Sequence, residues 1–482
     1  MNSISRRRFL EQAGLAGALL GACPLAGRAQ EPPPAGPSGK SNVVLVMLDT
    51  LRADKCGCYG YPADTTSELD KLAARGVVFE RVFSQCSWTK PSVGSLLSSL
   101  HPRSLGLYEE KNQALNDRFA TLGKTLKAAG FRTFGATANP NLNTLFNFHQ
   151  GFDKYIDTQV VFHWMRDQAP GKDVRGPSPL PGAPALFGEA LAWAQAQPEP
   201  QQARHFIQLN LMEVHEWYAA DSYSMRRAPY NEMFRQGTQY DRWTTHPNRR
   251  QRWHRYLQMA RQLTDDLGDF VAKLSVLPGW QDTLFVFLSD HGEGLESHIG
   301  VDRGEMHGFL LYESNVVVPL VLYHPAWQPK VSRVKQPMRL LDVMPTVLDL
   351  AGVPKPDPIE GVSLYPVIAG EAEQVALPPL FVAETAWYPK YEKLAGYRPD
   401  WNVYDNYGGH PGLPPWELQR ARERELGGQT SQAKSNPGVL LESQLLLRNW
   451  DKQHPKAPPT PVDRDMTQQE IEQLEAIGYL GG

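Results

Sequence analysis

Two apolar runs of the sequence each end in side chains that can bind a metal ion. Asp49 follows the run 42–48 (NVVLVML), and Asp290 with His291 follows the run 283–288 (TLFVFL). A carboxylate oxygen and an imidazole nitrogen on one sharp turn suit Zn²⁺ or Mn²⁺. The purely structural alternatives are a salt bridge at a strand end and an aspartate that caps a helix.

Thr89 can supply a nucleophile for the same site. It stands two residues before Pro91, and because proline favours the first turn of a helix, a helix is expected from about Pro91 through Leu97. A hydroxyl just before a helix lies at the positive end of its dipole, where an oxyanion or a phosphate binds. Metal coordination and that dipole can lower the pKa of the hydroxyl far enough for nucleophilic attack. The alternative is that Thr89 only caps the helix.

Alternating strands and helices are predicted to position these residues. The two apolar runs are typical of strands buried on both faces of a sheet. Further strands are expected at 131–138, 205–211 and 316–322, and helices at 67–75, 91–97, 115–129, 255–274, 340–351 and 468–477. This order predicts an α/β fold with a mostly parallel central sheet flanked by helices. Ligands of such sheets bind at the carboxyl ends of the strands, which is where Asp49 and Asp290 fall.

The composition excludes several other classes of protein. The 482 residues include 49 Lys and Arg against 52 Asp and Glu, and the net charge of −3 gives no electrostatic reason to expect nucleic-acid binding. Hydrophobic residues make up 41% of the chain and charged residues 21%, which is typical of a folded protein. Only four cysteines are present, which excludes a disulfide scaffold and a four-cysteine zinc module.

The first thirty residues are predicted to be an export signal rather than part of the fold. The basic segment 5–10 (SRRRFL) precedes an apolar run, 13–25, that is too short to span a bilayer comfortably. Paired arginines followed by Phe-Leu resemble the twin-arginine signal, so we expect export to the bacterial periplasm. Two processing routes remain open. The segment ending at Cys23 (LGAC) resembles a lipobox, which would make Cys23 a lipid anchor and the only membrane contact, whereas 27–29 would suit ordinary cleavage.

Three further regions are expected after the signal. Residues 31–40, rich in Pro and Gly, form a linker. Residues 41–370 form the catalytic domain, and residues 371–482, where the periodic pattern loosens, form a smaller C-terminal region with a terminal helix. Segments 164–204 and 220–255 look like insertions. The second is rich in Arg, Trp and Tyr, so it is either a solvated loop or a rim that recruits an anionic group.

Seven ordered segments resemble the sulfatase-like branch of the alkaline phosphatase superfamily. Together they span about residues 42–366, and the C-terminal segment 477–481 (IGYLG) also resembles tails seen in this family. The segments are 42–60 (NVVLVMLDTLRADKCGCYG), 69–73 (LDKLA), 88–97 (WTKPSVGSLL), 212–215 (MEVH), 289–292 (SDHG), 306–313 (MHGFLLYE) and 340–352 (LLDVMPTVLDLAG). The resemblance implies a metal-dependent enzyme that acts on an anionic phosphate or sulfate ester.

The resemblance also assigns roles by position. It implies that Asp49, Asp290 and His291 bind the metal and that Thr89 is both a metal ligand and the nucleophile. One tight site is expected, for Zn²⁺ or Mn²⁺ rather than Ca²⁺ or Mg²⁺, because Asp-His replaces the Asp-Asn common in sulfatases. A second metal stays uncertain, since no Asp-X-X-X-His pattern precedes His215, although Asn210 and Glu213 lie near it.

Three more residues complete the expected site. The resemblance implies that His215 contacts the transferred group and that His307 supports this group or a second metal. Lys90 either adds a cation beside the oxyanion or is a solvated lysine. Asp54 and Asn139 also fall near expected strand ends, but no role is assigned to them.

Two departures from the family pattern direct the functional prediction. Sulfatases carry at the nucleophile position a Cys or Ser that becomes formylglycine, whereas this chain has Thr89, and Val93 replaces the arginine of the motif. The resemblance therefore points to members with a threonine nucleophile, which act on phosphodiesters or phosphonates or transfer head groups such as phosphoethanolamine or phosphoglycerol. The alternatives are a sulfatase that works without formylglycine and a non-catalytic exported binding protein on the same fold. The natural substrate, the acceptor and the oligomeric state stay open.

Overall fold

The computed structural model describes residues 41–108, 112–158, 182–215, 247–295, 307–386, 392–406, 413–422 and 431–476, without the side chains of 247–252. All of these belong to one compact unit, residues 35–482. The predicted export signal, the linker, Cys23, the tail segment 477–481 and most of the Arg-rich insertion lie outside the described residues. No helix in the described part of the chain is long and apolar enough to cross a membrane.

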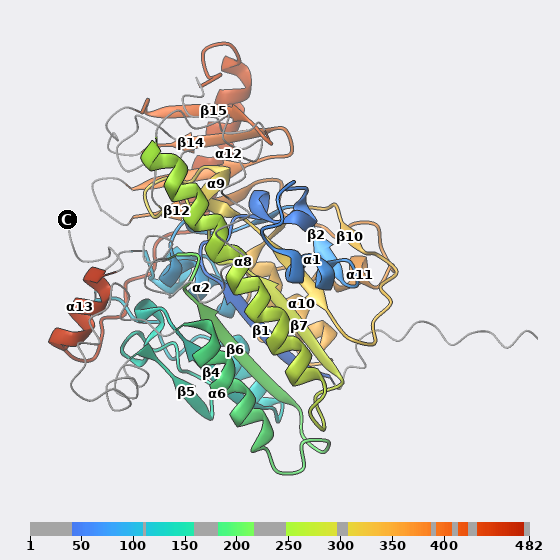
Figure 1. Ribbon diagram of the computed structural model, residues 1–482. Coiled ribbons are helices and arrows are strands. Elements are labelled where there is room, and N and C mark those ends of the chain that lie inside the picture. Colours follow the sequence, from blue (N-terminus) through green and yellow to red (C-terminus); the bar gives the residue numbers. More distant parts are fainter. Residues whose placement is uncertain are drawn as a thin grey trace, which may run out of the picture. The chain divides into compact units, whose positions relative to one another are not determined.

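A mostly parallel sheet forms the centre of the fold, as predicted (Figure 1). β1 is buried throughout and pairs in parallel with β6 and β7, and only β9 runs antiparallel to its neighbours. The carboxyl ends of β1 and β7 therefore meet at one edge of the sheet. Across the sheet the strands are β10 (Arg333–Val334), β2 (Val77–Phe79), β9 (Leu320–Tyr323), β7 (Thr283–Leu288), β1 (Asn42–Leu48), β6 (His205–Leu211), β4 (Arg132–Thr137) and β5 (Lys154–Ile156).

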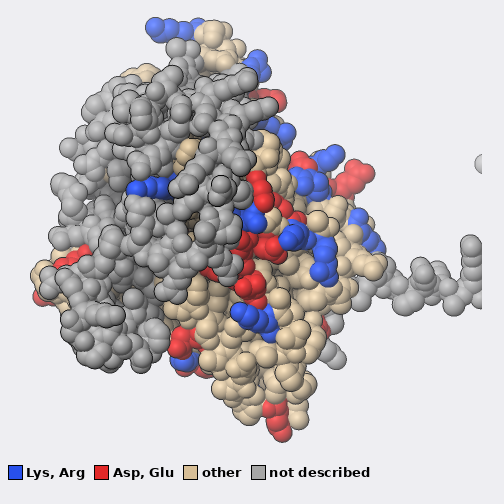
Figure 2. Space-filling view, viewed as in Figure 1, with Lys and Arg blue, Asp and Glu red and all other residues tan. Residues whose placement is uncertain are grey.

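Two sets of helices bury the sheet. The first set, which runs in front of the strands in Figure 1, consists of α1 (Ser67–Ala73), α6 (Ala183–Gln195) and α8 (Pro247–Ser275). The second set, whose members pack on one another, consists of α2 (Thr89–Ser98), α4 (Leu122–Ala128) and α10 (Val343–Leu350). Figure 2 shows acidic and basic side chains side by side over α1 and α8, where Arg261 pairs with Asp64 and Asp265.

Two smaller sheets accompany the central one. β3 (Val82–Phe83), β8 (Val317–Val318) and β11 (Met338–Arg339) form a three-stranded sheet. β12 (Phe381–Thr385), β13 (Lys393–Tyr397), β14 (Trp401–Asp405) and β15 (Trp416–Arg420) form an antiparallel sheet against which α12 (Pro437–Gln453) packs. Short helices complete the described chain: α3 (Pro102–Leu105), α9 (Glu313–Val316), α11 (Tyr365–Ile368), α13 (Gln468–Ala476), and the 3-10 turns η1 (Ala53–Lys55), η2 (Gly57–Tyr59), η3 (Pro140–Leu142), η4 (Thr144–Phe146) and η7 (Leu340–Asp342).

A buried arginine joins the antiparallel sheet to the main body. Arg103 in α3 donates from Nε to Glu384 of β12 at 2.9 Å and from Nη1 to Asp451 of α12 at 2.6 Å. Its guanidinium carbon lies 4.6 Å from the centre of the Trp450 ring. The division of the chain at residue 370 stays a prediction.

Several elements differ from the sequence prediction, each for a local reason. The helix expected over 115–129 begins only at Leu122, because the Thr121 side chain caps it by accepting from Lys124 N at 3.2 Å. The strand expected over 316–322 splits into β8 and β9 at Pro319, which has no N–H for a ladder bond. The helix expected over 255–274 begins earlier, at Pro247, and α12 with the antiparallel sheet was not predicted.

Candidate active site

Three buried side chains from two neighbouring strand ends form a group that can hold a metal ion. One ligand atom each of Asp49, Asp290 and His291 lies within 4.8 Å of the others, and all three residues are buried. His291 Nε2 is 3.7 Å from Asp49 Oδ1 and 3.4 Å from Asp290 Oδ2. His291 Nδ1 lies 2.9 Å from Gly292 O and therefore carries the proton. This tautomer leaves the Nε2 lone pair available on the side of the carboxylates.

The electrostatics of this group favour a cation. Among the described residues, neither Asp49 Oδ1 nor Asp290 Oδ2 has a hydrogen-bond partner. Burial, together with the nearby Asp290 carboxyl, raises the pKa of Asp49 to about 7. Burial likewise raises the pKa of Asp290 to about 7. Two buried carboxylates with oxygens that accept no hydrogen bond from described residues are costly, and a divalent cation would offset that cost. The donors present therefore fit a metal ion.

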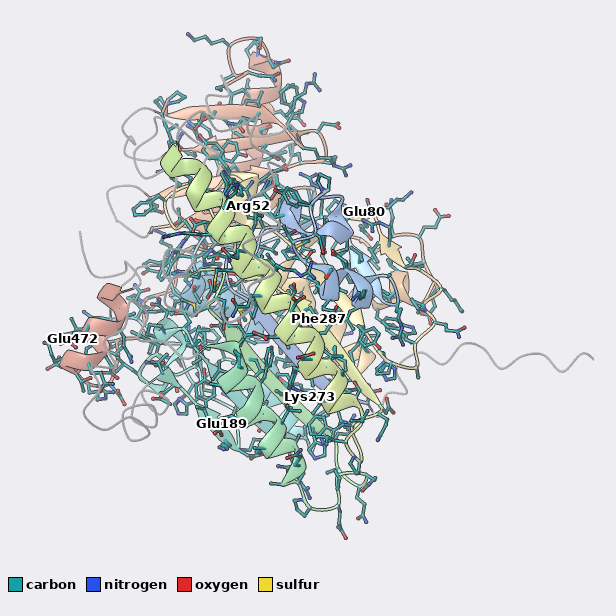
Figure 3. The ribbon with its side chains drawn as sticks, viewed as in Figure 1. Arg52, Glu80, Glu189, Lys273, Phe287 and Glu472 are labelled. Atoms are coloured by element: carbon teal, nitrogen blue, oxygen red, sulfur yellow. The ribbon has the colours of Figure 1, made fainter. Side chains whose placement is uncertain are left out.

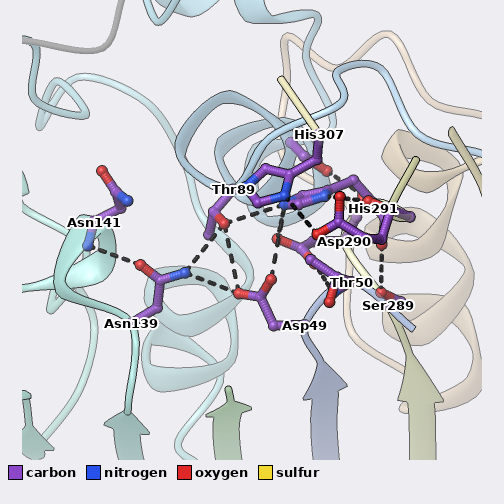
Figure 4. A network of polar contacts seen from close by, with 12 residues as sticks. Asp49, Thr50, Thr89, Asn139, Asn141, Ser289, Asp290, His291 and His307 are labelled. Atoms are coloured by element: carbon purple, nitrogen blue, oxygen red, sulfur yellow. Dashed lines mark hydrogen bonds and ion pairs between the residues drawn. The ribbon is translucent and has the colours of Figure 1, made fainter. Parts of the chain in front are cut away.

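Thr89 faces this group from the first residue of α2. Its Oγ1 lies 3.3 Å from His291 Nε2 and 3.5 Å from Asp49 Oδ2 (Figure 4). The helix begins two residues earlier than predicted, with Trp88 at the N-cap position and no side-chain cap. The alternative that Thr89 only caps the helix is therefore wrong. Ser92, one turn further on, donates to Asp290 O at 2.6 Å and ties α2 to the end of β7.

Asn139 is a member of the site to which the sequence analysis gave no role. Its Nδ2 donates to Asp49 Oδ2 at 2.8 Å and lies 3.1 Å from Thr89 Oγ1. Its Oδ1 accepts from Asn141 N at 2.9 Å, which fixes the orientation of the amide. The signal for this residue was its place just after β4, at the same sheet edge as Asp49.

Two further histidines, His215 and His307, lie next to each other beside His291. The His307 ring centre lies 4.8 Å from that of His215 and 4.8 Å from that of His291. His307 Nδ1 is 3.0 Å from Glu293 Oε2, and Glu293 was not singled out by sequence. Burial, together with the neighbouring histidines, holds the pKa of His215 and of His307 well below the ordinary value. Both imidazoles are therefore neutral near pH 7 in the protein without substrate.

The remaining candidates lie at the edge of the site or serve the fold. The Lys90 side chain is buried, so the alternative of a solvated lysine is wrong. Its ammonium lies 3.6 Å from the centre of the Phe146 ring, and its role beside the oxyanion stays a prediction. Asn210 Nδ2 lies 3.5 Å from Asp49 Oδ2 and supports that carboxylate. Glu213 instead accepts from Ala183 N at the start of α6.

Comparison with known proteins shows the family to which the chain belongs. The family model described as Sulfatase matches residues 41–353, which is more than half of the chain. The Δ4,5-hexuronate-2-O-sulfatase of Bacteroides thetaiotaomicron is 24% identical over 407 residues, covering 77% of this chain and 79% of that protein. Arylsulfatase A of Homo sapiens is 24% identical over 379 residues, covering 68% of each protein.

A solved structure shows the same fold. The phosphonate monoester hydrolase of Agrobacterium radiobacter superposes with a TM-score of 0.69 at 19% identity, covering 86% of this chain and 96% of that one. The chain therefore belongs to the sulfatase family of the alkaline phosphatase superfamily, as its sequence motifs predicted. It is an ester hydrolase of that superfamily.

Proposed function

We propose that this protein is a metal-dependent hydrolase or transferase that uses Thr89 as the nucleophile on phosphodiester, phosphonate or related ester substrates. The observation that carries the proposal is the position of Thr89 Oγ1, 3.3 Å from His291 Nε2 and 3.5 Å from Asp49 Oδ2. The likeness to a phosphonate monoester hydrolase supports phosphorus chemistry.

Asp49, Asp290, His291 and Thr89 would hold one metal ion, with Zn²⁺ or Mn²⁺ favoured over Ca²⁺ or Mg²⁺ because one donor is an imidazole nitrogen. The bound ion would supply positive charge that lowers the pKa of the hydroxyl and stabilises charge on the ester. A second ion stays an open part of the proposal.

The chain's own groups account for two successive displacements. Thr89 Oγ1 gives up its proton to solvent and attacks phosphorus, a Thr89 O–P bond forms, and the bond to the leaving oxygen breaks as a histidine protonates that oxygen. Water or an acceptor hydroxyl then attacks phosphorus and gives its proton to the same histidine, while the Thr89 O–P bond breaks and Thr89 Oγ1 takes up a proton from solvent. Asn139, which donates toward Oγ1, stabilises charge on that oxygen in both steps. Dividing one displacement in this way lowers each barrier.

His215 and His307 serve the ester in this scheme. A neutral His215 can donate its one N–H to a non-bridging oxygen. The Nδ1–H of His307 is directed at the Glu293 carboxylate, so His307 donates to the ester from its other ring nitrogen only when it is protonated to the imidazolium. The negative charge of a bound ester raises the pKa of a nearby imidazole, so either histidine can protonate the leaving oxygen in the complex.

We further propose that the protein works after export to the periplasm. The support is the sequence of residues 1–30, with its paired arginines and short apolar run, and the linker that follows. A lipid on Cys23 would tether the enzyme to a membrane. Mass analysis of the N-terminal peptide of protein from a membrane fraction separates lipidation at Cys23 from simple cleavage near residue 29.

Hydrolysis of sulfate esters without formylglycine is the second candidate. The specific observation for it is the match to two named sulfatases over 77% and 68% of this chain. Their reactions belong to those proteins, and neither comparison assigns a substrate here.

Turnover of three matched aryl esters by the purified mature protein tests the proposal: a phosphodiester, a phosphonate monoester and a sulfate. We expect phosphorus esters to be preferred and Thr89→Ala to lower kcat by about 10³-fold or more. Thr264→Ala is the matched control, because Thr264 is also buried but its hydroxyl donates to backbone carbonyls within α8, those of Ala260 and Arg261. Full activity of Thr89→Ala would refute the assignment of Thr89 as the nucleophile. A preference for the sulfate ester would favour the second candidate, a sulfatase that works without formylglycine.

A further inference from the structure

The turn that carries Asp49 is held in a conformation that its residues do not favour. Thr50, which is buried, has a φ of 61°. A β-branched residue rarely adopts this left-handed region, so such a residue persists only where surrounding contacts fix it. In this conformation Thr50 N lies 3.5 Å from Asp290 Oδ1. The strained turn therefore lies directly against the second carboxylate of the site.

A phenol from α8 closes this turn. Tyr256 is buried, and its hydroxyl donates to Thr50 O at 2.7 Å and accepts from Arg52 N at 2.9 Å. Both backbone groups belong to the residues that follow Asp49. Tyr256 thus pairs with one buried carbonyl and one buried amide of this turn.

Arg52 links the turn after Asp49 to the turn that carries Asp290 and His291. Its Nη1 donates to Glu293 O at 2.9 Å, two residues beyond His291. Its Nε and Nη2 donate to the two oxygens of Asp54 at 2.9 and 3.0 Å. The guanidinium carbon lies 5.4 Å from the ring centre of Trp253, three residues before Tyr256 on α8, and Figure 3 shows Arg52 beside this helix.

We propose that Tyr256, acting with Arg52, is a positioning residue for the metal: it fixes the turn that carries Asp49 relative to the turn that carries Asp290 and His291. The inference rests on the metal site of the proposed function. The ligands follow two different strands, and the two carboxylates, Asp49 and Asp290, repel each other without a cation. A turn released from Tyr256 can relax toward a favoured φ, which moves Asp49 and weakens metal binding. The Tyr256 hydroxyl bonds to backbone groups of Thr50 and Arg52 rather than to a side chain of the ligand group, so the chemistry at saturating metal is expected to be unchanged.

The test compares Tyr256→Phe with Tyr59→Phe. Tyr59 is a matched control because its hydroxyl also joins two backbone segments, β2 and β9: it donates to Phe79 O at 2.9 Å, lies 3.2 Å from Leu320 O and accepts from Leu320 N at 2.8 Å. Zn²⁺ and Mn²⁺ dissociation constants are measured by chelator competition on the full mature protein, alongside Tm and kcat at saturating metal. We expect Tyr256→Phe to raise the dissociation constant by about 10- to 100-fold, Tyr59→Phe to leave it unchanged, and both to lower Tm.

Each outcome is decisive. Equal metal affinity in Tyr256→Phe and Tyr59→Phe would overturn the inference while leaving the proposed function intact. A loss of kcat that saturating metal does not restore would also overturn it, because Tyr256 would then act on the reaction itself. Wild-type protein that binds neither metal would refute the metal site, and with it both proposals. If Tyr256→Phe does not fold, the test uses Arg52→Lys, which keeps the positive charge but loses the several N–H donors of the guanidinium. This variant must then show the same loss of metal affinity.

Discussion

Replacement of Asn139 by alanine gives the sharpest single-residue prediction about the site. The change removes an N–H that lies 2.8 Å from Asp49 Oδ2 and 3.1 Å from Thr89 Oγ1. A hydrogen bond to a charged group contributes about 1.5 to 3 kcal/mol. Since about 1.4 kcal/mol corresponds to a factor of ten in rate, kcat/KM should fall by about 10- to 150-fold. Because the contact is to the nucleophile, the loss should appear mainly in kcat rather than in KM.

Asn141→Ala is the matched control for this measurement. Asn141 is equally buried, its Nδ2 has no hydrogen-bond partner among the described residues, and it supports Asn139 only through its backbone N–H, which alanine keeps. Both variants are assayed at saturating metal on the preferred aryl ester. The reasoning would be refuted if Asn139→Ala were as active as Asn141→Ala, or if Asn139→Asp, which places a third carboxyl beside Asp49, were as active as wild type.

Three further predictions concern the metal, acid stability and the C-terminal sheet. Chelation should abolish activity, Zn²⁺ or Mn²⁺ should restore it better than Ca²⁺ or Mg²⁺, and Asp290→Ala should prevent restoration; restoration of that variant to wild-type turnover would contradict the ligand assignment. Burial lowers the pKa of His205 from 6.5 to about 4, so between these two pH values the unfolded chain binds a proton that the folded chain does not. The free energy of unfolding should therefore decrease as the pH is lowered from 6.5 to about 4, by up to about 1.4 kcal/mol per pH unit. Denaturant titrations at several pH values should show a weaker pH dependence of this free energy for His205→Asn than for wild type. Arg103→Met removes the guanidinium that pairs with the buried Glu384 carboxyl and should cost about 3 to 5 kcal/mol of stability. Adding Glu384→Gln should partly recover this loss, whereas an unchanged Tm for Arg103→Met would refute the importance of this junction.

The two strand ends of the site could be predicted because a strand that is buried on both faces has a continuous apolar sequence. The runs before Asp49 and Asp290 are continuous and apolar, and both became strands buried throughout. Parallel pairing of β1 with β7 then brings their carboxyl ends together. The family motifs added Thr89, His215 and His307, and the structure gathers them around the same point, although their roles stay predictions.

The supporting residues were less accessible because they depend on packing between distant segments. Tyr256 contacts Thr50 across 206 positions of the chain, and a lone tyrosine in a helical pattern carries no sign of that contact. Asn139 gave a signal through its place after β4, but only the coordinates show which way its amide points. The antiparallel sheet β12–β15 escaped prediction because its short strands lack long apolar runs and lie in a Pro- and Gly-rich region.

Trapping a covalent intermediate tests the central claim most directly. Metal-loaded mature protein is mixed with the preferred aryl ester, quenched in acid within the first turnover, and analysed by intact mass and peptide mapping, with Thr89→Ala in parallel. The account predicts a phosphoryl-type adduct on the peptide that carries Thr89 and none in the variant. Product formation in the first turnover without any adduct on Thr89, or an adduct on another residue that persists in Thr89→Ala, would contradict it.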